Sequence, residues 1–262
     1  MGSLLLPTLL KDVKKELNAG VQLYSVREDM LANATGTLKA LAKIGIRQIE
    51  SAASTKGYYY GLSPKEMKTI CSDLGMTLRS GHVPLNDKWP EILDQAAESG
   101  QEYLICSSFA FADQTPDTYK KVAERFNKAG EEAMKRGIKF GYHNHDFEFE
   151  KYNGVPLYNL LLEHSDPKLV HMELDLAWVL GSGFSPLDYF EKYPGRFPLW
   201  HLKDLNIAEK RSTEFGKGSL PIKNILDHAN ASGLKYYFIE QEEYSMQPLD
   251  AIQYNLKYLQ AL

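Results

Sequence analysis

The sequence predicts a closed parallel barrel of eight β/α units. Three observations predict it: a length of 262 residues, eight short apolar runs with the length of strands, and one type of helix-to-strand joint that recurs five times. A length of about 250 residues is typical of one such barrel. No linker or low-complexity stretch divides the chain. We therefore expect one domain over residues 1–262, with residues 1–19 as an extension before the first strand.

The recurring joint is a helical stretch that ends in glycine and is followed within a residue or two by a strand-like run. Glycine just past a helix end tolerates the left-handed backbone conformation that closes the helix. The five joints contain Gly45, Gly75, Gly100, Gly137 and Gly233. Repeated joints of one type favour alternating helices and strands, and hence a barrel rather than isolated helices.

The expected strands are residues 21–26, 46–50, 77–83, 103–106, 139–143, 170–174, 198–202 and 236–240. Three helix starts between them carry a serine or threonine followed by proline, which suits the first helical position. They are Ser63-Pro64, Thr115-Pro116 and Ser185-Pro186, and Glu66 completes a capping box with Ser63. Eight strands alternating with helices fit a closed barrel better than an open, doubly wound sheet.

Charge and composition favour small-molecule chemistry. The net charge is −4, and no basic face of the kind that binds nucleic acid is visible. No apolar run reaches the length of a membrane span. Cys71 and Cys106 form no CxxC motif, so we expect buried thiols. We expect a small molecule as the partner, with no nucleic acid and no membrane, and a homo-oligomer is compatible with the sequence.

The amino terminus carries an apolar stretch within residues 1–10, but no basic residue precedes it. It therefore does not have the composition of a signal peptide. We expect a cytoplasmic protein, or a periplasmic one if an export signal has been removed from the natural chain.

Polar residues gather at the ends of the expected strands, where barrel enzymes place their chemistry. The ends of the last four strands supply His143, Asp175, His201 and Glu240, among other histidines and carboxylates. Buried charges cost several kcal/mol each unless they are paired or bound to metal. Convergence of His, Asp and Glu from successive strands is what a metal site requires, although a salt-bridge network at the barrel mouth is the alternative.

Six segments, in order from the first strand to the last, carry a resemblance to a known family. They are Gly20-Val-Gln-Leu-Tyr-Ser-Val-Arg27, Gly141-Tyr-His-Asn-His-Asp-Phe-Glu-Phe149, Met172-Glu-Leu-Asp-Leu-Ala-Trp178, Leu199-Trp-His-Leu-Lys-Asp204, Gly216-Lys-Gly-Ser-Leu220 and Ile239-Glu-Gln241. The sequence resembles the xylose isomerase-like TIM barrels of the sugar phosphate isomerase/epimerase group.

The resemblance implies one divalent cation held by a residue from each of the last four strands, usually Glu, Asp, His and Glu. The last three positions correspond to Asp175, His201 and Glu240, while His143 stands where the fifth-strand glutamate would be. This mixed nitrogen and oxygen set suits Mn²⁺, Zn²⁺, Co²⁺ or Fe²⁺. In the alternative arrangement, His145 is the ligand and His143 bonds a neighbouring carboxylate.

The resemblance also implies that the two glutamates move the substrate proton, so Glu240 is a catalytic candidate. Because the fifth-strand carboxylate is missing, another base has to serve. The candidates are His145, Glu173, Glu148 and His82. His145 follows His143 by two residues, so both face inward if the strand continues, and an imidazole suits proton transfer near neutral pH. Glu173 could instead pair with Lys203 or Arg27.

The expected substrate-binding residues lie at the strand ends: Tyr24, Arg27, Glu50, His82, Trp178 and Lys203. Lys203 either binds a substrate oxygen or neutralises the carboxylates. The aromatic residues Tyr58, Tyr59, Tyr60, Phe109 and Phe111 follow strand ends two and four, where they either stack on a sugar or pack.

The leading functional hypothesis is a metal-dependent sugar isomerase or epimerase that forms an enediolate next to a carbonyl. A close alternative is a lyase or hydrolase in which the same carbanion expels a leaving group from a keto-glycoside. A non-catalytic sugar-binding barrel is the third hypothesis. An abasic-site endonuclease is disfavoured, because the chain has seven histidines and a net negative charge.

Overall fold

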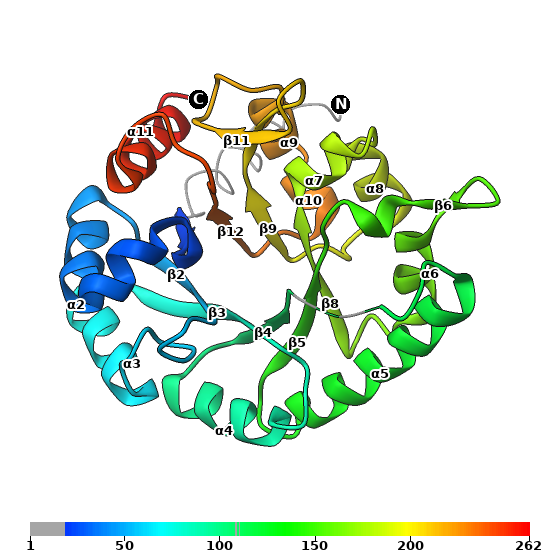
Figure 1. Ribbon diagram of the computed structural model, residues 1–262, viewed down its shortest axis with the longest axis horizontal. Helices are drawn as coiled ribbons and strands as arrows, with labels where there is room; N and C mark the ends of the chain where they lie inside the picture. The colour runs from blue at the N-terminus through cyan, green and yellow to red at the C-terminus, as the bar shows by residue number, and fades with distance from the viewer. Residues whose placement is uncertain (1–18, 108, 110) are drawn as a thin grey trace, which may run out of the picture.

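The computed structural model describes residues 19–107, 109 and 111–262. Eight parallel strands close into a barrel in the order β1-β12-β9-β8-β5-β4-β3-β2, and helices surround it (Figure 1). The expected barrel is therefore confirmed. The extension expected before the first strand lies, except for Ala19, outside the described residues.

The barrel strands agree closely with the expected ones. They are β1 (Gly20–Gln22), β2 (Gln48–Ala52), β3 (Thr77–Val83), β4 (Tyr103–Cys106), β5 (Lys139–His143), β8 (Val170–Asp175), β9 (Leu199–Leu202) and β12 (Tyr236–Ile239). β3, β4 and β5 have the expected bounds, and the others differ by one or two residues except at the first strand.

The first strand is much shorter than expected. β1 ends at Gln22, and residues 23–26 form a 3₁₀ helix, η1 (Leu23–Val26). The Gln22 side chain accepts a hydrogen bond from the Tyr24 N–H at 3.1 Å and so starts this helix. The expectation of a strand over 21–26 was wrong, because its apolar β-formers also suit a short buried helix.

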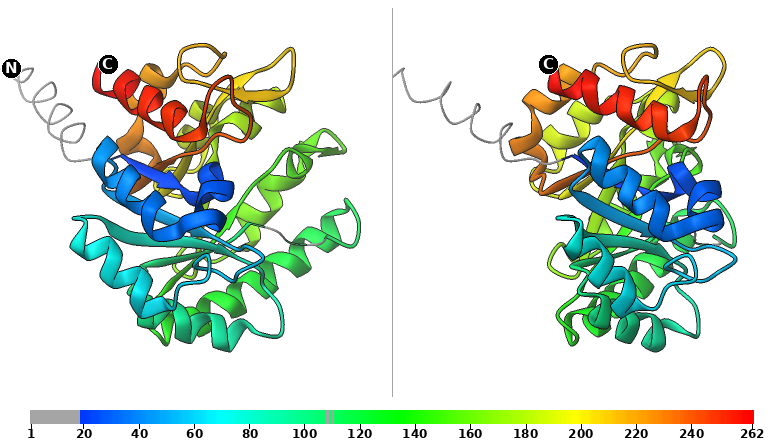
Figure 2. Two further views of the ribbon diagram at one scale, coloured as in Figure 1. Left: turned by 60° about the vertical axis from the view of Figure 1, so that its left-hand side comes forward. Right: turned by 90° about the vertical axis from the view of Figure 1, so that its left-hand side faces the viewer.

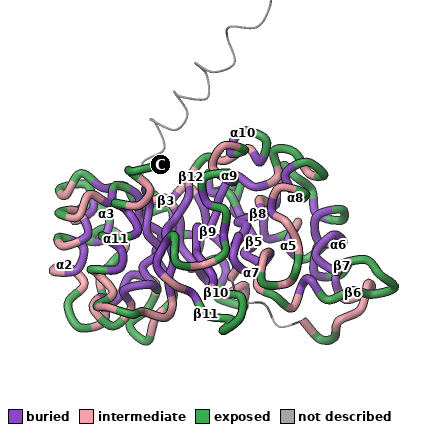
Figure 3. Tube along the Cα trace, turned by 90° about the horizontal axis from the view of Figure 1, so that it is seen from above, coloured by how far each residue is buried: buried purple, intermediate pink, exposed green. Residues whose placement is uncertain are grey.

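The helices outside the barrel are α2 (Arg27–Ile44), α3 (Pro64–Asp73), α4 (Trp89–Ser99), α5 (Pro116–Met134), α6 (Leu157–His164), α7 (Leu176–Gly181), α8 (Pro186–Lys192), α9 (Ile222–Asp227), α10 (Ala229–Ser232) and α11 (Pro248–Gln260). The last helix, α11, lies beside α2 and completes the ring (Figure 2). Seen from above, the strands are buried while the outer turns are exposed (Figure 3). Among the described residues, no helix is both long and apolar enough to span a membrane.

Smaller elements follow two of the barrel strands, β5 and β9. They are η2 (Phe147–Phe149), the hairpin β6 (Lys151–Tyr152) with β7 (Val155–Pro156), and the hairpin β10 (Asp204–Asn206) with β11 (Arg211–Thr213). η2 follows β5 and β10 follows β9, so both lie on the carboxyl side of the barrel. Cys71 and Cys106 are buried thiols, as expected.

The expected glycine joints are present. All five glycines have a positive φ, from 69° at Gly75 to 116° at Gly45. At Gly45, the N–H donates to the carbonyls of Leu41 and Ala42 at 3.2 Å, which closes α2 before the chain enters the next strand. A side chain at these positions would strain the turn.

Four apolar side chains from β4, β9 and β12 fill part of the interior of the barrel. Tyr103, Ile105, Leu199 and Phe238 form a cluster of their own, separate from the main core. Two glycines make room for it: a Cβ on Gly20 would lie 2.5 Å from Phe238 Cδ1, and a Cβ on Gly141 would lie 2.5 Å from Ile105 Cδ1. We call these four residues the apolar plug.

The two expected Ser-Pro helix starts, at Ser63 and Ser185, differ in whether the serine side chain caps its helix. Ser63 makes the full capping box, with its Oγ accepting from Glu66 N at 3.2 Å and its own N–H donating to Glu66 at 2.8 Å. Ser185 precedes α8, but its side chain makes no capping hydrogen bond. We expect Ser63→Ala to lower the free energy of unfolding by about 1 kcal/mol, and Ser185→Ala to change it little. Urea denaturation of both variants checks this, and equal losses would contradict it.

Candidate functional site

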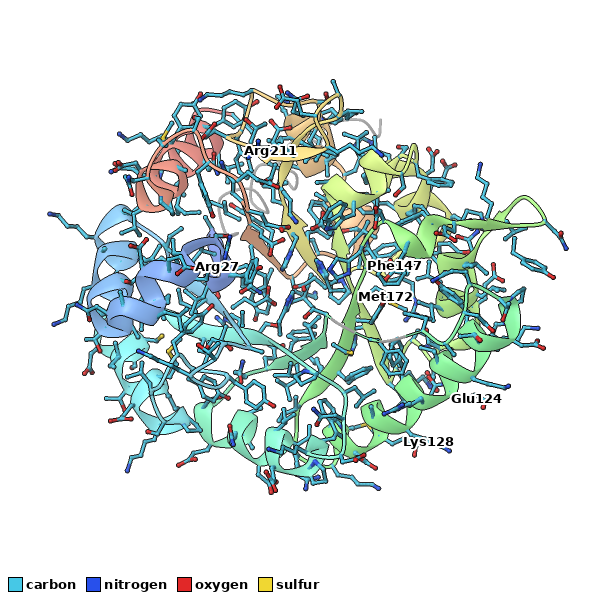
Figure 4. The ribbon with its side chains drawn as sticks, viewed as in Figure 1. Arg27, Glu124, Lys128, Phe147, Met172 and Arg211 are labelled. Carbon is cyan, nitrogen blue, oxygen red and sulfur yellow. The ribbon has the colours of Figure 1, made fainter. Side chains whose placement is uncertain are left out.

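A cavity of about 360 Å³ lies at the carboxyl ends of the strands. It is lined by Tyr24, Ala52, Ala53, His82, Val83, Pro84, Ser107, His143, His145, Trp178, Glu240 and Glu242. Six of the expected site residues are in this lining. In Figure 4, Arg27 and Phe147 mark opposite sides of the barrel's centre. The cavity is where the expected chemistry should take place.

Three of the expected metal ligands lie together. Asp175, His201 and Glu240 each offer one ligand atom within 4.8 Å of the others, and we call them the outer group. His201 Nδ1 is 2.9 Å from Glu240 Oε2 and 4.0 Å from Asp175 Oδ2. Strand register explains this, because Asp175 pairs with His201 across β8 and β9.

The Asp175 carboxylate is held by the helix that follows it. Its Oδ1 accepts from the N–H groups of Ala177 and Trp178 at 2.9 and 3.0 Å, so Asp175 is the N-cap of α7. This fixes the side chain and leaves Oδ2 facing the site. The fourth expected ligand, His143, approaches the outer group through Nε2, which is 3.9 Å from Asp175 Oδ2.

A second group lies next to the first and shares His201 with it. His82, His143, Glu173 and His201 could also hold a metal ion, and we call them the inner group. Glu173 Oε2 lies among the three imidazoles, 2.6 Å from His82 Nε2, 3.3 Å from His201 Nε2 and 3.5 Å from His143 Nδ1. Pairing of Glu173 with Lys203 or Arg27 was therefore the wrong expectation. Glu173 pairs with His143 in the β5–β8 register, so it faces the imidazoles.

Glu50 lies beneath the cavity rather than in its wall. It is fully buried, and its Oε1 is 2.6 Å from His201 Nε2 and 3.4 Å from His82 Nε2. The same oxygen accepts from Gln22 Nε2 at 2.8 Å. Gln22 was not among the expected site residues, although its position at the end of the first strand is the signal that could have found it.

Lys203 neutralises carboxylates, which was one of its two expected roles. Its Nζ is 3.0 Å from Asp175 Oδ2, 2.8 Å from Glu240 Oε2 and 2.6 Å from Glu242 Oε1. The ammonium also lies 5.0 Å from the centre of the Trp178 ring. Glu242, which lines the cavity, was missed as a site residue; it follows Glu240 by two positions, and that spacing was the available signal.

The buried charges shift one another's pKa values. Burial and the neighbouring Glu50 carboxylate raise the pKa of Glu173 well above its usual range. Burial opposes the charged form of His201, but Glu173, Glu240 and Glu50 outweigh it and raise the His201 pKa. Burial lowers the pKa of His82 to about 4. Glu240 is also buried, yet Lys203 and His201 hold its pKa well below the usual range.

His145 lines the cavity although β5 ends two residues before it. Its ring meets the His143 ring edge-on, with centroids 5.0 Å apart, and stacks on Phe147. The backbone N–H of His145 donates to Glu148 Oε2 at 2.9 Å, and the Tyr142 hydroxyl donates to the other oxygen of Glu148. Glu148 is buried behind His145 and is not part of the cavity lining, so it supports this turn instead of facing a substrate. Burial raises the pKa of Glu148 to about 7.

Arg27 stands behind Tyr24. Its guanidinium lies 4.4 Å from the centre of the Tyr24 ring, and its Nη1 donates to the Tyr24 carbonyl at 3.1 Å. Of the expected substrate-binding residues, Tyr24, His82 and Trp178 line the cavity, whereas Arg27, Glu50 and Lys203 contact residues next to it.

The expected aromatic cluster packs. Tyr59 and Tyr60 are buried in the core, and Phe109 and Phe111 pack on each other with ring centroids 5.6 Å apart. None of the five aromatic residues lines the cavity in the described part of the chain.

The residues present fit a metal ion. Among the described residues, four buried side-chain atoms around the site lack a hydrogen-bond partner: Glu50 Oε2, His143 Nδ1, His145 Nδ1 and Glu173 Oε1. A fifth, Asp175 Oδ2, accepts no hydrogen bond, although the Lys203 ammonium lies 3.0 Å from it. Buried polar groups normally find partners, so such a concentration points to a missing one. Imidazole nitrogens mixed with carboxylate oxygens suit a first-row transition metal or zinc.

Known proteins resemble this one in sequence and in structure. An inosose dehydratase of Clostridium tetani is 28% identical over 169 residues, which cover 56% of this chain and 55% of that protein. The chain thus spans about half the length of the curated relatives it matches. A sugar phosphate isomerase/epimerase from Parabacteroides distasonis has a solved structure that is 28% identical, with a TM-score of 0.83 and 94% of each chain covered.

A third structure, described as the IOLI protein with a binding zinc atom, is 14% identical with a TM-score of 0.74 and covers 92% of this chain and 96% of its own. At that identity the likeness concerns the fold. A family model for the xylose isomerase-like TIM barrel matches residues 38–262. Since this match takes in most of the chain, the protein belongs to the xylose isomerase-like TIM barrel family.

Proposed function

We propose that the protein is a divalent-metal-dependent lyase that eliminates water or another β-leaving group next to the ketone of a sugar or cyclic polyol. The observation that carries the proposal is the outer group with His143, placed at a cavity that His145 and Trp178 also line. The inosose dehydratases among the relatives favour elimination over isomerisation.

In this proposal the metal ligands are His143, Asp175, His201 and Glu240. A bound Mn²⁺, Zn²⁺, Co²⁺ or Fe²⁺ would polarise the ketone oxygen and so acidify the neighbouring C–H. The Lys203 ammonium contacts the carboxylates of Asp175 and Glu240, and it also contacts Glu242. If a cation bound Asp175 and Glu240, Glu242 would remain as a partner for the ammonium.

His145 is the proposed proton carrier. Burial lowers its pKa, so the imidazole is neutral at neutral pH and can accept a proton. It takes the proton from the carbon next to the ketone, the C–H electron pair becomes the new C=C bond, and the β C–O bond breaks. The imidazolium returns the same proton to the departing hydroxyl, which leaves as water. Trp178 offers a flat apolar face to the sugar ring.

One proton carrier is enough for this elimination, and that supports the lyase. An epimerisation requires a second group that delivers a proton to the opposite face of the carbon. His82 is poorly suited to this, because its Nε2 is engaged by Glu173 at 2.6 Å and burial lowers its pKa to about 4. Glu173 itself is fully buried and lies outside the cavity lining.

A sugar isomerase or epimerase is the second candidate. It is favoured by the Parabacteroides distasonis structure, which matches 94% of the chain, whereas the dehydratase matches 56%. Glu240, which lines the cavity, would then be the second proton carrier.

The deciding experiment uses the purified protein loaded in turn with each of the four cations. Ketoses, 3-keto-glycosides and a cyclic keto-polyol are incubated with it in heavy water, and the products are analysed by mass spectrometry. The lyase predicts a product that has lost one water or one alcohol. A product of unchanged composition that has gained deuterium at carbon would instead establish the isomerase. Metal binding without conversion of any substrate would favour a sugar-binding protein.

Glu240→Gln should remove most activity, by a factor of about 10² or more, because it removes a charged ligand of the metal that would polarise the ketone. The substitution keeps the size of the side chain but removes the charge that contacts His201 and Lys203. Cys71→Ser is the control, because Cys71 is a buried thiol in α3, away from the cavity lining. Initial rates on the best substrate measure both, and full activity of Glu240→Gln would refute the assignment.

His143→Ala and His145→Ala should separate metal binding from proton transfer. We expect His143→Ala to lower the metal content, and His145→Ala to keep the metal but lose turnover by a factor of about 10² or more. Elemental analysis beside initial rates gives both readouts. The reverse pattern would mean that His145 is the ligand, and unchanged turnover in both variants would exclude the end of β5 and the loop after it from the chemistry.

A further inference from the structure

Each of the two histidines proposed as ligands has its ring nitrogens directed to different partners. His201 Nδ1 faces the outer group, 2.9 Å from Glu240 Oε2. His201 Nε2 faces away from that group and lies 2.6 Å from Glu50 Oε1. All three side chains are almost fully buried, so no bulk water competes for these contacts.

His143 also has one ring nitrogen toward the outer group and the other toward a second carboxyl group, but here Nε2 faces the outer group. Its Nε2 is 3.9 Å from Asp175 Oδ2 of the outer group, and its Nδ1 is 3.5 Å from Glu173 Oε2. The Nδ1 atom has no hydrogen-bond partner among the described residues, and neither has Glu173 Oε1.

We propose that Glu50 and Glu173 are positioning residues, which accept the N–H of His201 Nε2 and of His143 Nδ1 and thereby turn His201 Nδ1 and His143 Nε2 toward the metal. The inference rests on the ligand set of the proposed function. Histidines that bind metals commonly donate their other ring N–H to a carboxylate, which fixes the tautomer and the ring orientation.

The surroundings hold the two carboxyl groups in place. Gln22 donates to Glu50 at 2.8 Å, and its other side-chain atom accepts from the Tyr24 N–H at 3.1 Å, which ties Glu50 to the wall of the cavity. On the other side, His82 Nε2 lies 2.6 Å from Glu173 and 3.4 Å from Glu50, and so bridges them. Neither carboxyl group can leave its histidine without breaking a buried contact.

The first experiment requires no substitution. Nitrogen-15 NMR of the zinc-loaded protein, labelled at histidine, reports which ring nitrogen carries the proton. We expect His201 to bind through Nδ1 with Nε2 protonated, and His143 to bind through Nε2 with Nδ1 protonated. If both bind through the opposite nitrogens, the metal lies in the inner group, Glu173 is a ligand, and the inference is wrong.

The second experiment measures zinc affinity by competition with a chelator. Glu50→Gln and Glu173→Gln should each weaken binding by about 10- to 100-fold while keeping one ion per chain. Glu148→Gln is the matched control, since Glu148 is an equally buried carboxyl group that contacts His145 and Tyr142 but neither proposed histidine ligand. The Co²⁺ absorption spectrum should shift in the first two variants and stay unchanged in the control.

The outcomes separate this inference from the function on which it rests. If the wild-type protein binds zinc and Asp175→Asn loses it, but Glu50→Gln and Glu173→Gln bind as the wild type does, only the inference fails. If Glu50→Gln or Glu173→Gln binds no zinc at all, that residue is a ligand and the inference is again wrong. A wild-type protein that binds none of the cations overturns both.

Discussion

Ionisable side chains inside the barrel are the constraint on which the rest of the structure depends. Glu50, Glu173 and His201 are fully buried, and charges removed from water are costly unless each finds a partner of opposite charge or a metal. Here the partners come from different strands, so each contact also fixes the register of the strands that carry it. His201 alone contacts carboxyl groups in β2, in β8 and at Glu240, the residue after β12. The same contacts therefore compensate the buried charges and hold the strands of the closed barrel in register.

Because alternate residues of a strand face the same side, the strands also determine which side chains point into the barrel at each level along its axis. Along β9 and the residue after it, the inward positions are occupied by Leu199, His201 and Lys203. Leu199 belongs to the apolar plug, His201 to the buried network, and the Lys203 ammonium lies near the cavity. Along β8, Glu173 belongs to the inner group and Asp175, two residues later, to the outer group. A single residue of slip in either strand would exchange these side chains for core residues.

Much of this could be predicted from the sequence. The glycine joints and apolar runs predicted the eight strands, and the polar strand ends predicted which residues would gather, because the carboxyl ends of parallel strands meet on one face. The partners of those residues could not be predicted. Glu173 faces three histidines rather than Lys203, since neighbours across a barrel depend on the stagger of the strands, which leaves no local pattern. The 3₁₀ turn after Gln22 was missed for a similar reason: Gln22 is held by Glu50, a residue 28 positions away.

The apolar plug determines how a ligand can enter and leave the cavity. Tyr103, Ile105, Leu199 and Phe238 fill the barrel below the buried network, so the cavity is a blind pocket and not a passage. Whatever enters over Tyr24 and Trp178 has to leave by the same mouth. In the lyase proposed above, the product has to leave through this opening before fresh substrate can enter, so the turnover rate cannot exceed the rate of product release.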